Sequence, residues 1–145
     1  MQHNSKIVSG DWQYHYWITP PELYKALNDE FNFDFDPFPY PVPEGFNGLT
    51  IEWGQRNYVS PPFFNTKCYG KVCNSKDWFR KAIEEQRKGK LSVIIHPLQL
   101  SYMELLQVMG AEIRNLGSVK FEAIEDRAKT WSHRLYPIAA FILRG

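Results

Sequence analysis

Hydrophobic positions recur along this chain with the spacing of both helices and strands. Apolar residues three and four positions apart predict a helix over 20–28, which Thr19 and Glu22 would cap as a capping box. Residues 31–36 alternate between phenylalanine and polar residues, which is typical of a half-buried strand. Residues 91–95 form an uninterrupted apolar run, which indicates a strand buried on both faces.

The same patterns predict the remaining elements. We expect strands over 49–53, 57–60, 112–116, 119–123 and 138–143, and helices over 78–88 and from Ser101 to just before Gly110. Asp77 would cap the first of these helices and Gly89 would end it. Because strands alternate with helices, the sequence predicts an α/β domain with a mostly parallel sheet, helices on both faces and an antiparallel C-terminal strand pair at one edge.

Composition places the chain among globular proteins with a single domain. It has 145 residues, of which 43% are hydrophobic and 23% charged, which is enough for one hydrophobic core. We expect residues 1–13 to be a flexible lead-in and residues 14–145 to form the domain. Met1–Trp12 is too polar for a signal peptide, and no apolar run reaches membrane-spanning length. These features predict an intracellular protein that does not enter a membrane.

The chain has two cysteines, Cys68 and Cys73, which lie in one loop. A structural zinc site needs four nitrogen or sulfur ligands, and no histidine lies close to this pair in the sequence. We therefore expect no metal site, and we interpret both cysteines as free thiols in a reducing compartment.

A stiff loop of four residues follows the strand expected over 57–60: Ser60, Pro61, Pro62 and Phe63. Prolines fix φ and lack N–H donors, so nearby carbonyl groups can accept hydrogen bonds from a ligand. The Ser60 hydroxyl adds an acceptor, and the Phe63 ring offers a face for stacking. These parts suit the exocyclic amino group of a nucleobase, and an ordinary proline turn is the alternative interpretation.

A second polar corner ends the predicted phenylalanine-rich strand. Asp34 and Asp36 lie there, where a carboxylate could accept hydrogen bonds from a ribose or could simply open a turn. Ligands of such sheets bind beyond the carboxyl ends of the strands, so we expect Asp36 and Ser60 to face one crevice. Further candidates for contact with a ligand are His96, Trp131 and His133.

Several short motifs follow one another along most of the chain. They are Trp17-Ile18-Thr19-Pro20, Phe33-Asp34-Phe35-Asp36-Pro37, Asn47-Gly48-Leu49 with Trp53, Ser60-Pro61-Pro62-Phe63, Trp78 with Lys81-Ala82, His96-Pro97, and Gly117 to Phe121. Their order and spacing resemble the phage-type DNA N6-adenine methyltransferases. The resemblance extends from about Tyr16 to the C-terminus, and no single motif carries it.

This resemblance implies a DNA methyltransferase with a Rossmann-like fold and S-adenosylmethionine as methyl donor. Catalysis would rest on Ser60, Pro61, Pro62 and Phe63, which would bind an amino group of a base that has left the duplex. DNA is the implied partner, in the cytoplasm of a phage- or prophage-bearing cell or in the nucleus or cytoplasm of a eukaryotic host. The residues implied to hold the donor are Trp17, Thr19, Pro20, Asp34, Asp36 and Pro37.

The motifs depart from this family at several positions. The family usually begins its catalytic tetrapeptide with Asp or Asn and ends it with Tyr, whereas this chain has Ser60 and Phe63. A glycine-rich donor loop does not follow Asp36, and the serine-led form resembles methyltransferases that act on cytosine N4. Three hypotheses therefore stand: adenine N6 methylation first, cytosine N4 methylation second, and a catalytically silent module that binds nucleic acid or a partner third.

Positive charge gathers in one segment of an almost neutral chain. The net charge is +1, which is low for a duplex-binding protein, but residues 65–76 carry Lys67, Lys71 and Lys76 without any acid. We expect this loop to bind DNA, with help from the polar segment 125–134. A homodimer would suit so small an enzyme.

Overall fold

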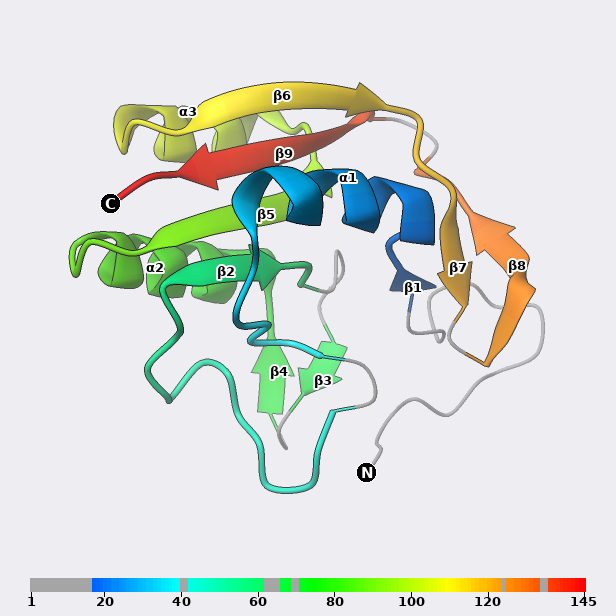
Figure 1. Ribbon diagram of the computed structural model, residues 1–145, viewed down its shortest axis with the longest axis horizontal. Coiled ribbons are helices and arrows are strands. Elements are labelled where there is room, and N and C mark those ends of the chain that lie inside the picture. The colour runs from blue at the N-terminus through cyan, green and yellow to red at the C-terminus, as the bar shows by residue number, and fades with distance from the viewer. Residues whose placement is uncertain (1–16, 40–41, 62–65, 69–70, 124, 134–135) are drawn as a thin grey trace.

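The computed structural model describes residues 17–39, 42–61, 66–68, 71–123, 125–133 and 136–145. Its helices are α1 (Pro21–Phe31), α2 (Ser75–Gln86) and α3 (Leu100–Val108). Its strands are β1 (Trp17–Ile18), β2 (Arg56–Val59), β3 (Thr66–Cys68), β4 (Lys71–Cys73), β5 (Leu91–Pro97), β6 (Glu112–Gly117), β7 (Phe121–Ala123), β8 (Asp126–Trp131) and β9 (Ile138–Leu143). Figure 1 shows α1 in front of the largest sheet, with α2 and α3 behind it.

The arrangement of strands overturns the predicted fold class. The largest sheet has the order β2-β5-β9-β6, in which β2 is parallel to β5 and β9 is antiparallel to both of its neighbours. A separate antiparallel sheet has the order β1-β7-β8, and β3 and β4 form a hairpin of their own. The fold is mixed α/β, so the expected mostly parallel, Rossmann-like methyltransferase sheet is wrong.

The reason lies in the last strand, which we expected at an edge. All six residues of β9 are buried, whereas most of β6 is only partly buried. A strand that is apolar on both faces is stable only between other strands and under helices on both sides. β9 therefore occupies an interior position, and the more polar β6 takes the edge.

Side chains of the large sheet alternate between two hydrophobic layers. Ile138 and Ile142 of β9 pack in one layer with Leu27 and Phe31 of α1. Phe141, between them in sequence, packs in the other layer with residues of α2 and α3. This period-two alternation anchors helices on both faces of the sheet.

Two predicted strands do not form. Helix α1 extends to Phe31, and Asn32 ends it in the left-handed conformation at φ 54°. In the segment that follows, only Phe35 makes a bridge, parallel to Asn57 of β2. Residues 49–53 form turns and irregular structure instead of a strand. Helical packing of Leu27 and Phe31 on the sheet outweighs the alternating pattern that begins at Phe31.

The helix starts also differ from the predicted caps. Pro20 precedes α1, and Thr19 makes no capping hydrogen bond there. Helix α2 begins with a capping box of Asn74 and Asp77, three residues before the predicted start. Helix α3 begins at Leu100 without a side-chain cap. The Thr19 hydroxyl instead hydrogen bonds to the Tyr58 hydroxyl of β2.

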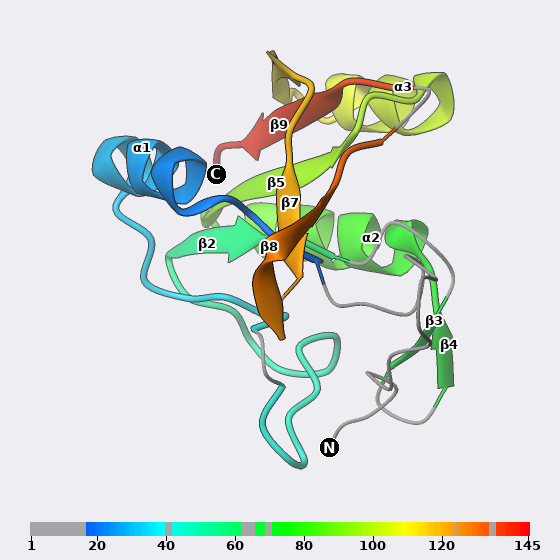
Figure 2. The same cartoon turned by 90° about the vertical axis from the view of Figure 1, so that its right-hand side faces the viewer.

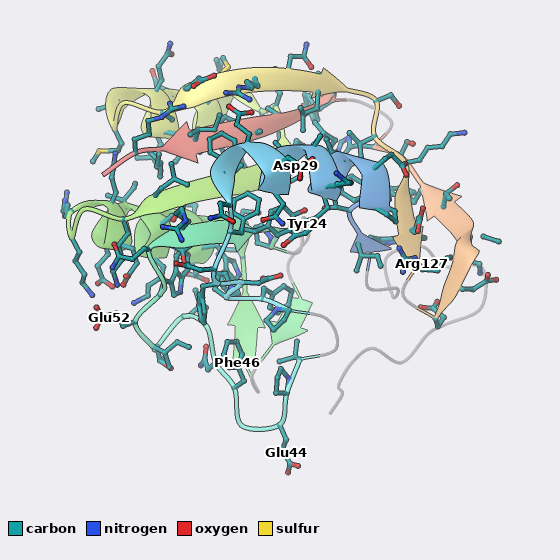
Figure 3. All side chains as sticks on the ribbon, in the orientation of Figure 1. Tyr24, Asp29, Glu44, Phe46, Glu52 and Arg127 are labelled. Carbon is teal, nitrogen blue, oxygen red and sulfur yellow. The ribbon has the colours of Figure 1, made fainter. Side chains whose placement is uncertain are left out.

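A buried ion pair joins α2 to the start of β5 and to the loop before β2. The Lys90 ammonium donates to Glu85 at 2.8 Å, to Glu52 at 2.9 Å and to the carbonyl oxygen of Trp53 at 2.7 Å. Figure 3 shows Glu52 on that loop, outside the sheet. The Glu85 side chain is fully buried and also accepts from the Trp53 amide at 3.3 Å. The pair therefore holds the backbone of the loop from both sides.

Further lysines compensate the Glu85 charge. Lys81 and Lys88 each lie 3.1 Å from its second carboxyl oxygen. Burial alone would raise the pKa of Glu85, but hydrogen bonds from Lys90, Lys81 and Lys88 lower it to about 2. The carboxylate is thus ionised at neutral pH.

We expect Glu85→Gln to lower the free energy of unfolding by about 3 kcal/mol, because it removes the buried counter-charge of Lys90 and leaves this lysine paired only with the exposed Glu52. Urea denaturation at pH 7 measures this loss. The neighbouring variant Glu84→Gln is the matched control, since Glu84 is largely exposed and its pairing with Lys81 contributes about 0.5 kcal/mol or less.

The same pair has a pH signature. Because the folded-state pKa of Glu85 lies below the usual 4.5, its contribution is complete above about pH 4.5 and is lost as the pH falls toward 2. Denaturation of the parent and of Glu85→Gln between pH 2 and 6 should show curves that converge at low pH. Parallel curves would contradict the assignment.

Candidate functional site

A cavity of about 190 Å³ opens where β2 ends, beside the first turns of α1. Three of the predicted site residues line it, one from each of three separate chain segments: Thr19, Asp36 and Ser60. The other described residues that line it are Ile18, Tyr24, Phe38 and Tyr58. The acidic corner and the serine that opens the proline loop therefore share one cavity.

Hydroxyl groups form one wall of this cavity. The Tyr58 hydroxyl hydrogen bonds to the hydroxyl of Thr19, and the Ser60 side chain lines the same wall. Burial raises the pKa of Tyr58, which stays a neutral phenol at physiological pH. Tyr24 extends from α1 over the end of β2, with its ring edge-on to Tyr58 at 4.8 Å between centroids (Figure 3). The wall offers several groups that can accept or donate hydrogen bonds.

Asp36 supplies the only carboxyl group among the described residues that line the cavity. Burial raises the pKa of Asp36 to about 6, although a hydrogen bond of 2.9 Å from the Phe38 amide favours the ionised form. Burial and the proximity of Asp36 also raise the pKa of Tyr24. Since none of the described lining residues is basic, a cation that enters the cavity would be the counter-charge of Asp36.

Two glycines let the loop before β2 approach the segment around Asp36 closely. A Cβ atom on Gly48 would collide with the carbonyl oxygen of Pro37, and one on Gly54 would collide with the side chains of Asp34 and Phe35. The loop thus packs directly against the backbone that carries Asp36. Asn47-Gly48, which the sequence marked only as part of a motif, serves to position this corner.

Other residues predicted to hold a donor lie outside the cavity. Asp34 is not among the lining residues, accepts from the Arg56 amide at 3.0 Å and pairs with the Arg56 guanidinium at 3.5 Å. Pro20 is buried and lines a separate hollow of about 390 Å³. Trp17 lies on β1 against Trp131, and Pro37 is buried under Gly48. Thr19 and Asp36 are therefore the two predicted donor-binding residues that the cavity brings together.

The proline loop and the lysines are only partly described. Pro61 is buried directly after Ser60, while Pro62 and Phe63 lie outside the described residues. Lys67 and Lys71 belong to β3 and β4, which form a hairpin that the sequence did not predict. Lys76 is exposed in the first turn of α2. The roles assigned to these residues stay predictions.

His96 does not line the cavity. It is 1% exposed, its Nδ1–H donates to the Pro97 carbonyl at 3.0 Å, and its Nε2 accepts from the Ser75 hydroxyl at 2.7 Å. Burial lowers the pKa of His96 to about 4, so the ring is neutral. It ties the end of β5 to the start of α2, which is a structural role.

Two tyrosines that the sequence analysis did not single out complete the site. Tyr58 is next to the predicted loop, and strand alternation places it on the face opposite Val59. Tyr24 lies one helical turn from Pro20 and reaches the same wall. A polar aromatic residue on an otherwise buried strand was the available signal for Tyr58.

The described residues contain no cluster of three or more metal-ligating side chains. No helix within the described ranges is long and apolar enough to cross a membrane. Comparison of the chain with protein-family models, with curated proteins and with solved structures finds no match. The chemistry of the site therefore has to be argued from its own geometry.

We expect Asp36→Asn to raise the free energy of unfolding at pH 7 by about 1–3 kcal/mol, because the buried carboxylate is ionised there at a cost. The pKa of Asp36 is about 6 in the folded chain against an ordinary 3.8, so the stability of the parent declines as the pH rises from about 4 to about 6. Thermal denaturation at pH 4 and pH 7 measures the difference. Asp34→Asn, which removes an ion pair on the surface, should give no such gain.

Proposed function

We propose that the chain transfers a methyl group from S-adenosylmethionine to an exocyclic amino group of a DNA base, with adenine N6 as the target. The observation that carries this proposal is the shared cavity of Thr19, Asp36 and Ser60, followed by the buried Pro61. It combines an anionic group that suits a cationic donor with hydroxyl and carbonyl acceptors that suit an amine.

The residues present fit the reacting end of the donor. S-adenosylmethionine carries a sulfonium and an ammonium group, and Asp36 offers a carboxylate for either cation. The volume of about 190 Å³ lies below the roughly 300–1,000 Å³ of pockets that enclose a whole ligand of this size. The cavity would therefore hold one end of the donor, and the rest would lie along its mouth.

When bound, S-adenosylmethionine supplies an electrophilic methyl group on sulfur. The exocyclic nitrogen of adenine is a weak nucleophile, because its lone pair is conjugated with the ring. Acceptors at Ser60 and at the Pro61 carbonyl would hold the N–H groups and turn the lone pair toward the cavity. Alignment of this kind can lower an activation barrier by roughly 7–11 kcal/mol. No general base has to act before the transfer.

Cytosine N4 is the second candidate target. Ser60 stands where a carboxylate or amide would be expected for adenine, and a serine hydroxyl is a weaker acceptor than a carboxylate. A silent binding module is the third candidate, since the cavity is small for a whole donor. Calorimetric titration with S-adenosylmethionine separates this module from both enzymes, because only the enzymes require donor binding.

Incubation with labelled S-adenosylmethionine and DNA of mixed sequence, followed by nucleoside mass spectrometry, tests activity and target together. We expect N6-methyladenine, and a loss of about 100-fold or more in Ser60→Ala, because that variant removes a positioning acceptor. N4-methylcytosine would establish the second candidate. Full activity of Ser60→Ala would remove this residue from the mechanism.

The pH dependence offers an independent check on Asp36. Donor binding by the parent should strengthen as the pH rises through about 6, because only the ionised carboxylate attracts a cation. Asp36→Asn should bind S-adenosylmethionine more weakly and without this pH step, as measured by calorimetry between pH 5 and 8. Asp34→Asn is the matched control and should keep the step.

The basic segment can be tested apart from the cavity. Replacement of Lys67, Lys71 and Lys76 by alanine should weaken DNA binding and flatten its dependence on salt, because fewer counterions are released. Fluorescence anisotropy at several salt concentrations measures both effects. Unchanged affinity would exclude this segment as the phosphate contact.

A further inference from the structure

A row of partly exposed aromatic rings runs along the small sheet and the segment after it. Its members are Trp17, Trp131, His133 and Tyr136, which we call the aromatic row. Successive ring centroids are 6.0, 5.7 and 5.4 Å apart in that order. In Figure 2 the β7–β8 hairpin, whose β8 ends at Trp131, faces the viewer. Neither the cavity nor its proposed chemistry uses these rings.

Packing and a hydrogen bond hold the rings of the aromatic row in place. Trp131 packs on Phe121 of β7, which is fully buried, with 6.3 Å between the ring centroids. The Tyr136 amide donates to Nδ1 of His133 at 3.1 Å, which holds these two residues together. Tyr136 is 41% exposed at the outer end. Rings held in this way can stack on a ligand with little loss of side-chain entropy.

One end of the row adjoins the cavity lining along the chain. Trp17 is followed directly by Ile18 and Thr19, which line the cavity. A polymer with one unit in the cavity would therefore have its neighbouring units beside the row. This continuity points to the flanking part of the same substrate as the occupant.

Charge decides which form of nucleic acid fits. On the β7–β8 hairpin and next to it in sequence, Lys120, Arg127 and Lys129 are matched in number by the acids Glu122, Glu125 and Asp126. Glu122 also pairs with Arg127 at 2.5 Å. A duplex hides its base faces and binds mainly through phosphates, which needs excess positive charge. A single strand exposes its bases, and these bases can stack on aromatic rings whatever the nucleotide sequence.

We propose that the aromatic row stacks against unpaired bases that flank the target, so that single-stranded DNA is the preferred substrate. This assignment rests on the proposed function, because the continuity with the cavity matters only if a base enters it. Trp131 and Tyr136 are the principal stacking residues, and Lys129 lies two residues before Trp131 on β8 to meet a phosphate.

The test is anisotropy of a fluorescein-labelled oligothymidylate titrated with the full chain, without methyl donor. We expect it to bind at least about tenfold more tightly than an abasic oligomer of the same length, which has the same charge but no bases. It should also bind more tightly than the same strand annealed to oligoadenylate. Equal affinity for the abasic oligomer, or tighter binding of the duplex, would overturn the proposal.

Variants locate the effect on the row. Tyr136→Ala should weaken binding of oligothymidylate about fivefold or more, while Tyr136→Phe keeps the ring and the affinity. Leu100→Ala, at a position 75% exposed on α3, is the control and should bind as the parent does. Trp131→Ala should weaken binding further, with circular dichroism to check its fold. Unchanged affinity of a folded Tyr136→Ala and Trp131→Ala pair would exclude the row.

The two proposals fail separately in this experiment. Thymine has no exocyclic amino group, so its binding does not depend on methyl transfer. Loss of oligothymidylate binding in the row variants, without any methylation by the parent, would support the row and reject the enzyme. Methylation by the parent with oligothymidylate binding unaffected by the variants would support the enzyme and reject the row.

Discussion

The buried pair of Glu85 and Lys90 is the constraint on which the site side of the molecule depends. Glu85 accepts a hydrogen bond from the Trp53 amide, and Lys90 donates one to the Trp53 carbonyl. The Trp53 indole in turn donates to the Gly48 carbonyl at 2.7 Å. Gly48 packs on the Pro37 carbonyl, next to the residue that places a carboxyl group in the cavity. A chain of hydrogen bonds and close packing thus links helix α2 to the backbone beside Asp36. Buried ion pairs are weak sources of net stability, but a loop held at two backbone atoms has little freedom to move.

The cavity shows the opposite balance between stability and function. Asp36 is partly buried without a described basic partner, and the ionised form of such a carboxyl group is unfavourable in the folded state until a cation arrives. Thr19 gives up a helix cap in order to contact the Tyr58 hydroxyl. Departures of this kind from local preference gather at sites where a protein binds something. This is the physical reason to place function here rather than at the better satisfied His96.

Several helices and strands could be predicted from the sequence, but the sheet topology could not, and the misses have specific causes. The apolar run at β5 and the position of α2 followed from periodicity. The place of β9 did not, because strand order depends on the relative burial of several strands, which no local pattern reports. The alternating pattern that begins at Phe31 does not form a strand, because Phe31 packs on the sheet as the last residue of helix α1. At the site, the motif residues marked Asp36 and Ser60, but Tyr24 joins them only through the tertiary fold.

The interior position of β9 has a consequence for how the protein is made. β9 pairs with β5 on one side and with β6 on the other, so β5 and β6 do not pair with each other. The nascent chain therefore carries an unpaired edge on β5 and another on β6 until residues 138–143 emerge from the ribosome. Such edges pair readily with other chains. Between synthesis of β6 and synthesis of β9, the sheet is thus incomplete and open to pairing with other chains.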